Sequence, residues 1–177
     1  MIRKARAEDL PELLRVYEAA REFMVKTGNP TQWISPDGKT KPTKEQLEMD
    51  IAQSKSYVYT DALGRIHAAF YYDYGQEVEP TYGKIDPARG LDNTGKWIGP
   101  ETYGVVHRIA SDGLMKGAGR TCLRWAMDQS AHLRIDTHEN NRPMQHVLEQ
   151  LGFALCGTIY LEDGDSRLAY EWVKDES

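Results

Sequence analysis

The first half of the chain carries a helical pattern of hydrophobic residues. Between Leu10 and Met24, apolar side chains recur every three or four residues, which is the spacing of one helix face. Asp9 followed by Glu12 has the pattern of a capping box, and Gly28 favours a helix end. We therefore expect an amphipathic helix between these two signals.

Further elements of the first half are predicted by start signals and alternation. Thr43 and Gln46 have the spacing that opens a helix, and two runs rich in aromatic and β-branched residues flank a turn at residues 61–64. The resulting prediction is an edge strand within residues 2–6, a helix from Thr43 to about Ser54, and a hairpin of strands at 57–60 and 66–72.

The second half is more regular and predicts a mixed sheet. Its expected elements, in chain order, are a strand at 102–110, a helix at 117–129, a strand at 133–136, a helix at 141–151, and a hairpin of alternating strands at 153–161 and 168–172. Strands that alternate with helices in this way form a sheet with helices on its faces. The fold class is therefore α/β with a mixed sheet.

Two segments lack such patterns. Residues 29–42 are broken by three prolines and hold Trp33, so we expect a surface loop. Residues 73–100 are rich in glycine and proline and show little periodicity, and loops of this length are usually functional or disordered. We interpret them as an insertion in one domain that spans residues 1–177.

Composition narrows the function classes. A length of 177 residues suits one domain, and a net charge of -5 argues against nucleic-acid binding, since no basic stripe is available for phosphates. Cys122 and Cys156 form no CxxC pair, which argues for a reducing compartment. No stretch approaches the ~20 apolar residues of a membrane helix, and the start lacks a signal-peptide core. We expect a cytoplasmic protein without membrane partners.

The strongest chemical signal is the stretch VVHRIASDGLMKGAGRTCLRW, in which a strand runs through a glycine-bearing turn into a helix. Unpaired backbone N–H groups and the helix dipole at such a turn suit a pyrophosphate. A simple tight turn is the alternative. The stretch is not a P-loop, because the Gly-Lys-Ser/Thr sequence is missing, and it does not fit the dinucleotide fingerprint.

Together with the later segment NNRPMQHVLEQLGF, this order of elements resembles the acetyl-coenzyme A-binding core of the GNAT N-acetyltransferase superfamily. The resemblance runs from about Tyr103 to Val173 and more loosely through the earlier residues. It implies a central, mixed, mostly antiparallel twisted sheet with helices on both faces. It also implies acetyl-coenzyme A as cosubstrate and an amine as acceptor, with no metal.

The resemblance assigns cofactor-binding residues. Ile109 and Ala110 would pair with the pantetheine arm, and Asn141 and Met144 would line the coenzyme from the next helix. The pyrophosphate cradle would be Leu114, Met115, Lys116, Gly117, Ala118, Gly119 and Arg120. The family usually has Gln or Arg where Leu114 stands, so the cradle depends on its backbone donors.

Catalysis needs a group that takes a proton from the attacking ammonium. His107 lies on the strand two residues before the expected bulge, and its ordinary pKa near 6.5 leaves it largely neutral at pH 7. We interpret His107 as the base or water relay, with a structural histidine as the alternative. Leu148 stands where the family often has the tyrosine acid. Cys156, Tyr160 and Tyr170 are acid candidates that no spacing selects.

The remaining polar and aromatic residues predict an acceptor pocket. Trp33, Tyr72 and His138 are its candidates, with Tyr71, Tyr74 and Trp97 as further aromatics, although Trp33 could equally anchor its loop to the core. A metal site formed by Asp136, His138, Glu139 and His146 matches no ligand spacing, so we expect no metal.

The function expected from these observations is acetyl transfer from acetyl-coenzyme A to an amine of a small molecule or peptide. A non-catalytic acyl-coenzyme A-binding module on the same fold is the main alternative, because fold alone does not fix function. ATP binding lacks the Walker lysine and magnesium carboxylates. A homodimer through an exposed strand edge or the glycine-rich insertion is also compatible with the sequence.

Overall fold

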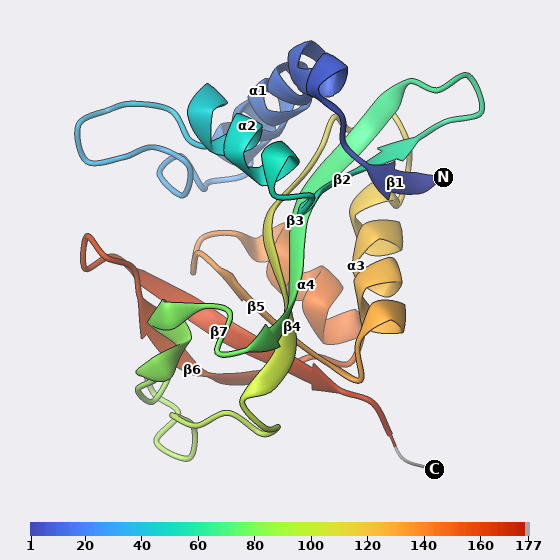
Figure 1. The fold of residues 1–177 in the computed structure, drawn as a ribbon. Coiled ribbons are helices and arrows are strands. Elements are labelled where there is room, and N and C mark those ends of the chain that lie inside the picture. The colour runs from blue at the N-terminus through green and yellow to red at the C-terminus, as the bar shows by residue number, and fades with distance from the viewer. Residues whose placement is uncertain (176–177) are drawn as a thin grey trace. The chain divides into compact units, whose positions relative to one another are not determined.

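The computed structural model describes residues 1–175 and divides the chain into two compact units. Unit 1 comprises residues 1–72 and 106–125, and unit 2 comprises residues 73–105 and 126 onward. The elements, drawn in Figure 1, are β1 (Ile2–Lys4), η1 (Ala7–Asp9), α1 (Leu10–Lys26), α2 (Lys44–Ala52), β2 (Ser56–Thr60), β3 (Ile66–Gln76), η2 (Pro80–Gly83), β4 (Thr102–Ser111), α3 (Ala118–Gln129), β5 (His132–Thr137), α4 (Arg142–Gln150), β6 (Ala154–Tyr160) and β7 (Ser166–Val173). Every predicted helix and strand is present.

The strands form a mixed seven-stranded sheet in the order β1-β2-β3-β4-β5-β7-β6. The pairs β1–β2, β2–β3, β5–β7 and β6–β7 are antiparallel, whereas β4 and β5 are parallel. The chain passes between the units along β3, β4 and α3. The predicted fold class, a mixed and mostly antiparallel sheet with helices, is confirmed.

Unit 1 has helices on both faces of its strands because β2 and β3 alternate their side chains. Val58 and Ala69 join a buried cluster with α1 and α2, whose members include Leu13, Val16, Tyr17, Ala20 and Leu47. The neighbouring residues Tyr57 and Phe70 point to the other face, where their rings lie 4.7 and 5.6 Å from that of Trp125 in α3. Figure 1 shows α1 and α2 on one side of β2 and β3 and α3 on the other.

The sequence predicted the cap of α2 correctly but not the cap of α1. The Thr43 hydroxyl accepts the Gln46 amide at 3.1 Å, as expected for the start of α2. The capping box expected from Asp9 and Glu12 is wrong. A short 3-10 turn, η1, precedes α1, and the Asp9 carboxylate accepts the Arg6 amide at 2.7 Å and pairs with Arg3.

Unit 2 buries a charged face of its sheet. Arg134 on β5 lies directly opposite Glu171 on β7, and both side chains are almost completely buried, as is His132. The covering segment is the insertion after β3: the Asp86 amide and carbonyl both bond to Thr158 of β6, and the Gly95 amide donates to the Cys156 carbonyl at 2.7 Å. The insertion therefore packs on unit 2 as an ordered part of its structure.

One glycine shows how closely the insertion approaches the sheet. A Cβ atom built on Gly157 of β6 would collide with the Asp86 backbone oxygen, so only glycine fits at this position.

Within residues 1–175, no helix combines the length and apolar character needed to cross a membrane.

Candidate functional site

Strand β4 carries a local irregularity in unit 1. Arg108 has a φ of 51°, a left-handed conformation that is uncommon for a residue with a side chain. Three contacts hold it: its guanidinium pairs with the buried Asp50 of α2 at 2.8 Å, it lies 4.8 Å from the Tyr71 ring, and its carbonyl accepts the Tyr17 hydroxyl at 2.6 Å. This left-handed residue lies one position before Ile109, where we expected the strand to bulge.

The turn after β4 is shaped by glycine. Gly113 and Gly117 have φ values of 76° and 74°, which glycine adopts without strain. Gly119, in the first turn of α3, has an ordinary backbone conformation, and a Cβ atom added there would meet no protein atom within 4 Å. The space beside the start of α3 is thus open, as a ligand cradle requires.

The amide groups of this turn fall into two sets. The Leu114 amide, at the predicted start of the cradle, donates to the Asp112 carboxylate at 2.9 Å. Ala118 and Thr121 donate to the carbonyls of Met115 and Gly117. In the described part of the chain, the amides of Lys116, Gly117 and Gly119 donate to no backbone acceptor outside the helix, and the start of a helix has no internal acceptor for them.

Behind the turn lies a buried network centred on His67 of β3. Its Nδ1 is 3.0 Å from the Asp112 carboxylate and its Nε2 is 2.8 Å from the Asp61 carboxylate. Arg15 of α1 also pairs with Asp112 at 3.0 Å. Asp112 thus connects the network directly to the turn through the Leu114 amide.

The charges of this network stabilise one another. Hydrogen bonding to Asp61, and then to Asp112, raises the pKa of His67 above its ordinary value. Burial alone would raise the pKa of Asp112, but the Leu114 amide, Arg15 and His67 together hold it below its usual value. These interactions therefore favour the imidazolium form of His67 and the carboxylate form of Asp112.

The predicted residues of β4 have distinct environments in unit 1. His107 is half-buried, with its ring 5.5 Å from that of Tyr71. Ile109 is also half-buried, whereas Ala110 is buried in the cluster formed with α1 and α2. The Ala110 side chain therefore packs in the protein core, and only its backbone remains for the pairing that we expected.

Asn141, Met144 and His138 belong to unit 2. The Asn141 side-chain oxygen accepts the Met144 amide at 3.2 Å and so caps α4. The His138 Nδ1 accepts the Asn140 amide at 3.0 Å, which leaves the proton on Nε2. Burial, followed by the charge of Arg167, lowers the pKa of His138. His138 is thus a neutral N–H donor.

The residues considered as the acid differ in burial. Burial raises the pKa of the Cys156 thiol to about 11, so this cysteine stays protonated. Leu148 is fully buried, and Tyr170 is 2% exposed. Tyr160 is 40% exposed, with Lys84 over its ring.

Two predicted acceptor residues lie in unit 1. The Trp33 ring packs 5.5 Å from that of Tyr17, which anchors its loop to α1. Tyr72 is buried, with its ring 5.4 Å from that of Trp125. Neither residue lines the cavity that unit 2 contains.

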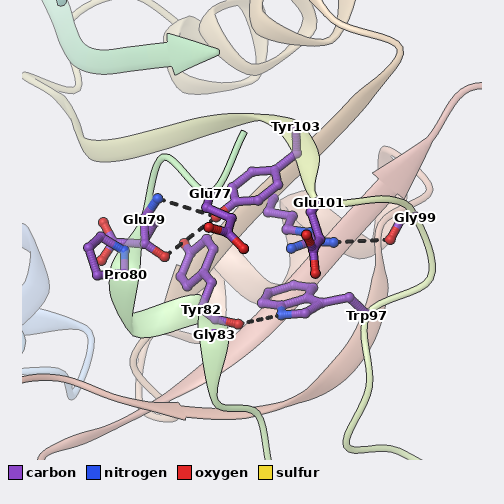
Figure 2. Close-up of a pocket in the computed structure, with 10 residues that line it drawn as sticks. Glu77, Glu79, Pro80, Tyr82, Gly83, Trp97, Gly99, Glu101 and Tyr103 are labelled. Atoms are coloured by element: carbon purple, nitrogen blue, oxygen red, sulfur yellow. Dashed lines mark hydrogen bonds between the residues drawn. The ribbon is translucent and has the colours of Figure 1, made fainter. Parts of the chain in front are cut away.

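Unit 2 contains a cavity of about 560 Å³ that sequence reasoning missed. Its lining, drawn in Figure 2, is Glu77, Glu79, Pro80, Tyr82, Gly83, Trp97, Gly99, Glu101, Tyr103 and Arg134. The insertion and the adjoining ends of β3 and β4 supply all of these residues except Arg134 of β5. Only Trp97 was among the aromatic residues that we expected in an acceptor pocket.

Arg134, the only cation lining the cavity among the described residues, is already engaged. Its Nε donates to Glu171 at 2.6 Å, and one terminal nitrogen donates to the Gly99 and Pro100 carbonyls. Its guanidinium also lies 4.4 Å from the Trp97 ring and 4.2 Å from the Tyr103 ring. Arg134 therefore serves to fix the insertion on the sheet.

Glu171 receives hydrogen bonds on both carboxylate oxygens. One oxygen accepts the Ile98 and Gly99 amides, and the other accepts His132 and Arg134. Burial alone would raise its pKa, but the hydrogen bonds from His132 and Arg134 and the Gly99 amide lower it to about 2. A signal for this cluster was present in the sequence, because His132, Arg134 and Asp136 occupy alternate positions of β5.

Titratable side chains do not gather into a metal site in the described residues: no group of three or more His, Cys, Asp or Glu side chains could hold a metal ion. Asp136, one of the four residues considered above, instead accepts the Tyr82 hydroxyl at 2.6 Å. Burial, with the adjacent Asp136 charge, raises the pKa of Tyr82 well above its ordinary value.

Comparison with known proteins supports the resemblance found in the sequence. No protein-family model matches the chain, and comparison with curated proteins gives no match. Among solved structures, a GNAT-family acetyltransferase from Streptococcus agalactiae 2603 is 28% identical, with a TM-score of 0.84 over 99% of this chain and 96% of its own.

Two more distant structures have the same fold. A ribosomal-protein-alanine N-acetyltransferase from Brucella melitensis is 18% identical, with a TM-score of 0.61 over 98% of this chain and 99% of its own. An N-acetyltransferase from Staphylococcus aureus Mu50 is 18% identical, with a TM-score of 0.59 over 98% and 97% of the two chains. The resemblance to GNAT-family acetyltransferases is thus confirmed, and it supports acetyl transfer as the general class of activity.

Proposed function

We propose that this chain, whose fold is that of GNAT-family acetyltransferases, transfers the acetyl group of acetyl-coenzyme A to an amine. The observation that carries the proposal is the succession in unit 1 of an irregular β4, a glycine-shaped turn and the start of α3 with open amides. These features suit a ligand that combines an extended amide-bearing arm with a pyrophosphate. The similarity to the streptococcal acetyltransferase extends over 99% of the chain.

The coenzyme would be held mainly by backbone groups of unit 1. The amides of Lys116, Gly117 and Gly119 would donate to the pyrophosphate, and the exposed Lys116 side chain adds positive charge beside them. Ile109 and Ala110 would offer backbone groups to the pantetheine arm. The coenzyme supplies an activated acetyl thioester, while the protein binds and orients it.

Transfer requires the acceptor amine to be neutral before it attacks. His107 is our candidate for the group that accepts this proton, directly or through one water molecule. Its position immediately before Arg108 means that the contacts that fix Arg108 also constrain the backbone beside His107. A backbone amide of β4 would stabilise the oxyanion that develops on the thioester carbonyl.

The proton for the departing thiolate has no dedicated donor among the predicted residues. Leu148 cannot provide one, and the buried Cys156 thiol has a pKa of about 11. Solvent is the simplest source. The lack of a dedicated donor favours one alternative function, a module that binds acyl-coenzyme A without turnover. That alternative predicts that the coenzyme binds but that no amine promotes release of its thiol.

The first experiment is thermal unfolding with acetyl-coenzyme A, coenzyme A or ATP. A ligand that binds only the folded state raises the unfolding midpoint, so we expect a rise with both coenzyme A species and none with ATP. Thiol release would then be measured over a panel of amines. An absence of any midpoint shift at millimolar coenzyme would overturn the proposal, and binding without thiol release would favour the non-catalytic module.

The role of His107 is tested by its pH profile. If His107 accepts the proton, His107→Ala should lower kcat by about 10²-fold or more and remove the acidic limb of the activity profile. Coenzyme binding, read from the thermal shift, should persist. A pH profile of the variant that matches the parent would remove His107 from the mechanism.

A further inference from the structure

The His107 ring packs against an aromatic residue of the neighbouring strand. Tyr71 of β3 lies with its ring centroid 5.5 Å from that of His107, and the two ring planes are inclined by 37°. The Arg108 guanidinium contacts the same Tyr71 ring at 4.8 Å. Tyr71 therefore contacts two consecutive side chains of β4, although successive side chains of a regular strand point to opposite faces.

The left-handed conformation of Arg108 accounts for this departure from alternation. Its φ of 51° takes the backbone out of the regular path of a strand, so the side chains of His107 and Arg108 both reach the Tyr71 ring. A residue with a side chain keeps such a conformation only where its surroundings hold it. A change in the contacts that hold Arg108 would therefore also change the surroundings of the His107 ring.

Asp50 of α2 provides the strongest of these contacts. Its two carboxylate oxygens accept the Arg108 Nε at 3.0 Å and Nη2 at 2.9 Å, and this paired geometry fixes the orientation of a guanidinium. The Asp50 side chain is 4% exposed, and Gln46, one turn earlier in α2, donates to it at 3.0 Å. The carboxylate is thus also held by its own helix.

Stability alone is a poor reason for this arrangement. A buried ion pair is often no more stabilising than apolar residues of the same volume, because both charges lose their hydration. A left-handed residue with a side chain adds strain, and such residues cluster at functional sites. Here the strained residue lies next to the candidate base, and all of these contacts lie within unit 1.

We propose that Asp50 and Tyr71 are positioning residues for His107. Asp50 fixes Arg108, and Arg108 and Tyr71 together fix the imidazole ring in the orientation in which it accepts a proton from the amine. Neither positioning residue touches the substrate in this role. The positioning depends on contacts of unit 1 alone, whereas the proton transfer rests on the proposed function.

Relaxation of the His107 ring carbon, measured by nuclear magnetic resonance on the full chain, tests the positioning without any substrate. Histidine labelled at Cε1 gives one signal for each ring, and the signal that is absent in His107→Ala identifies His107. Such data report motion of the ring on the picosecond-to-nanosecond timescale. We expect a high order parameter in the parent and a lower one in both Asp50→Asn and Tyr71→Leu, because each variant removes a contact that restrains the ring.

Glu48→Gln is the matched control, because it removes one charge from the exposed side of the same helix. It should leave the His107 order parameter unchanged. Because Asp50→Asn removes a buried charge, Tyr71→Leu provides a second test that removes none, and unchanged His67 signals would show that unit 1 is folded. The proposal is overturned if the order parameter stays the same in both variants, or if it falls equally in Glu48→Gln.

Turnover then shows whether the two residues act through His107. Asp50→Asn should lower kcat about tenfold, because a misplaced base accepts the proton less efficiently. In the His107→Ala background the same change should have no further effect, since no base is left to position. Tyr71→Leu replaces Asp50→Asn in this cycle if the latter does not fold. An equal loss in both backgrounds would overturn the proposal and identify a merely structural role.

The two readouts separate this proposal from the proposed function. If the ring becomes more mobile as expected but no amine promotes thiol release from acetyl-coenzyme A, the positioning of the ring holds and acetyl transfer fails. If amines are acetylated while the order parameter stays the same in both variants, acetyl transfer holds and the positioning is wrong.

Discussion

Each unit contains a network of a histidine and an arginine, with two carboxylates in unit 1 and one in unit 2, and the two networks satisfy their charges differently. In unit 1, both ring nitrogens of His67 face carboxylates, so only the doubly protonated imidazolium can donate to both. In unit 2, Glu171 receives Arg134, two amides and a single N–H of His132. The second network needs no extra proton.

The two networks therefore have different roles: the unit 1 network positions the turn before α3, whereas the unit 2 network attaches the insertion to the sheet. The unit 1 network ends on Asp112, which holds the first amide of an open turn and leaves the following amides for a ligand. The unit 2 network uses each oxygen of its carboxylate to fasten the insertion. We therefore expect changes in unit 1 to alter ligand binding, and changes in unit 2 to alter stability first.

The largest effect should follow Glu171→Gln. This change leaves Arg134 buried without its counter-charge, and breaking a buried pair in this way typically costs about 3 to 5 kcal/mol. Urea unfolding would measure the loss. The control, Glu162→Gln, alters an exposed residue in the turn before β7 and should change the free energy of unfolding by less than about 0.5 kcal/mol. Equal stability of the two variants would contradict the attachment role.

Asp112→Asn should lower the free energy of unfolding by less than Glu171→Gln does, but it should also weaken coenzyme binding. The carboxylate accepts hydrogen bonds from the Leu114 amide, Arg15 and His67, and weakening such bonds to a charged group costs about 2 kcal/mol. Coenzyme affinity should fall as well, because the turn loses its support. Parallel urea unfolding and calorimetric coenzyme titration would reveal both effects, and an unchanged coenzyme affinity would show that the network does not position the turn.

Gly119→Ala should separate binding from stability. The added methyl group meets no protein atom, and alanine is the better helix former, so the free energy of unfolding should hold or rise slightly. The methyl group would obstruct a pyrophosphate at the helix start, which we expect to cost about 1.5 kcal/mol of coenzyme affinity. Gln129→Ala, at the exposed end of the same helix, is the control. Undiminished affinity in Gly119→Ala would place the pyrophosphate elsewhere.

The smallest effect concerns the pH dependence of the unit 1 network, which is opposite in sign to that of unit 2. Because the pKa of His67 is raised on folding, its contribution is complete below the ordinary value of 6.5 and is lost as pH rises through the folded value. We expect a loss of about 1 kcal/mol, typical of one hydrogen bond to a charged group. His67→Gln should flatten this part of the stability curve, and an unchanged curve would contradict the assignment.

The unit 2 network should respond at the acidic end instead. The pKa of Glu171 is lowered from its ordinary 4.5 to about 2, so its contribution is present above pH 4.5 and is lost as pH falls towards 2. Urea unfolding across this range would show a decline in the parent that Glu171→Gln lacks. A decline of the same size in both proteins would assign it to other carboxylates.

Local patterns predicted the elements well, because they depend on residues close in sequence. Thr43 was identified as a helix start from its spacing to Gln46, and the helix predicted at 141–151 begins at Asn141; both side chains cap their helices. Asp9 was misassigned because Arg3 and Arg6 compete for its carboxylate. A capping pattern considers only the residues at the helix start, so it does not include a side chain such as Arg3 in the preceding strand.

The unit 2 cavity could not be predicted for a related reason. Polar residues at alternate positions of a strand, as at His132, Arg134 and Asp136 of β5, normally indicate a solvated face. Here the insertion covers that face, and its position depends on contacts with β6 that are distant in sequence. The charges are buried because they bind the covering segment, and periodicity alone does not reveal this.

The bonds between Asp86 and Thr158 have a consequence for assembly. β6 is the last strand of the sheet order, and an unprotected last strand offers its backbone to any other extended chain. The insertion occupies that edge with two hydrogen bonds from Asp86 and a third from Gly95. A second molecule could extend the sheet here only after this segment detaches, so the insertion also protects the protein against strand-mediated aggregation at β6.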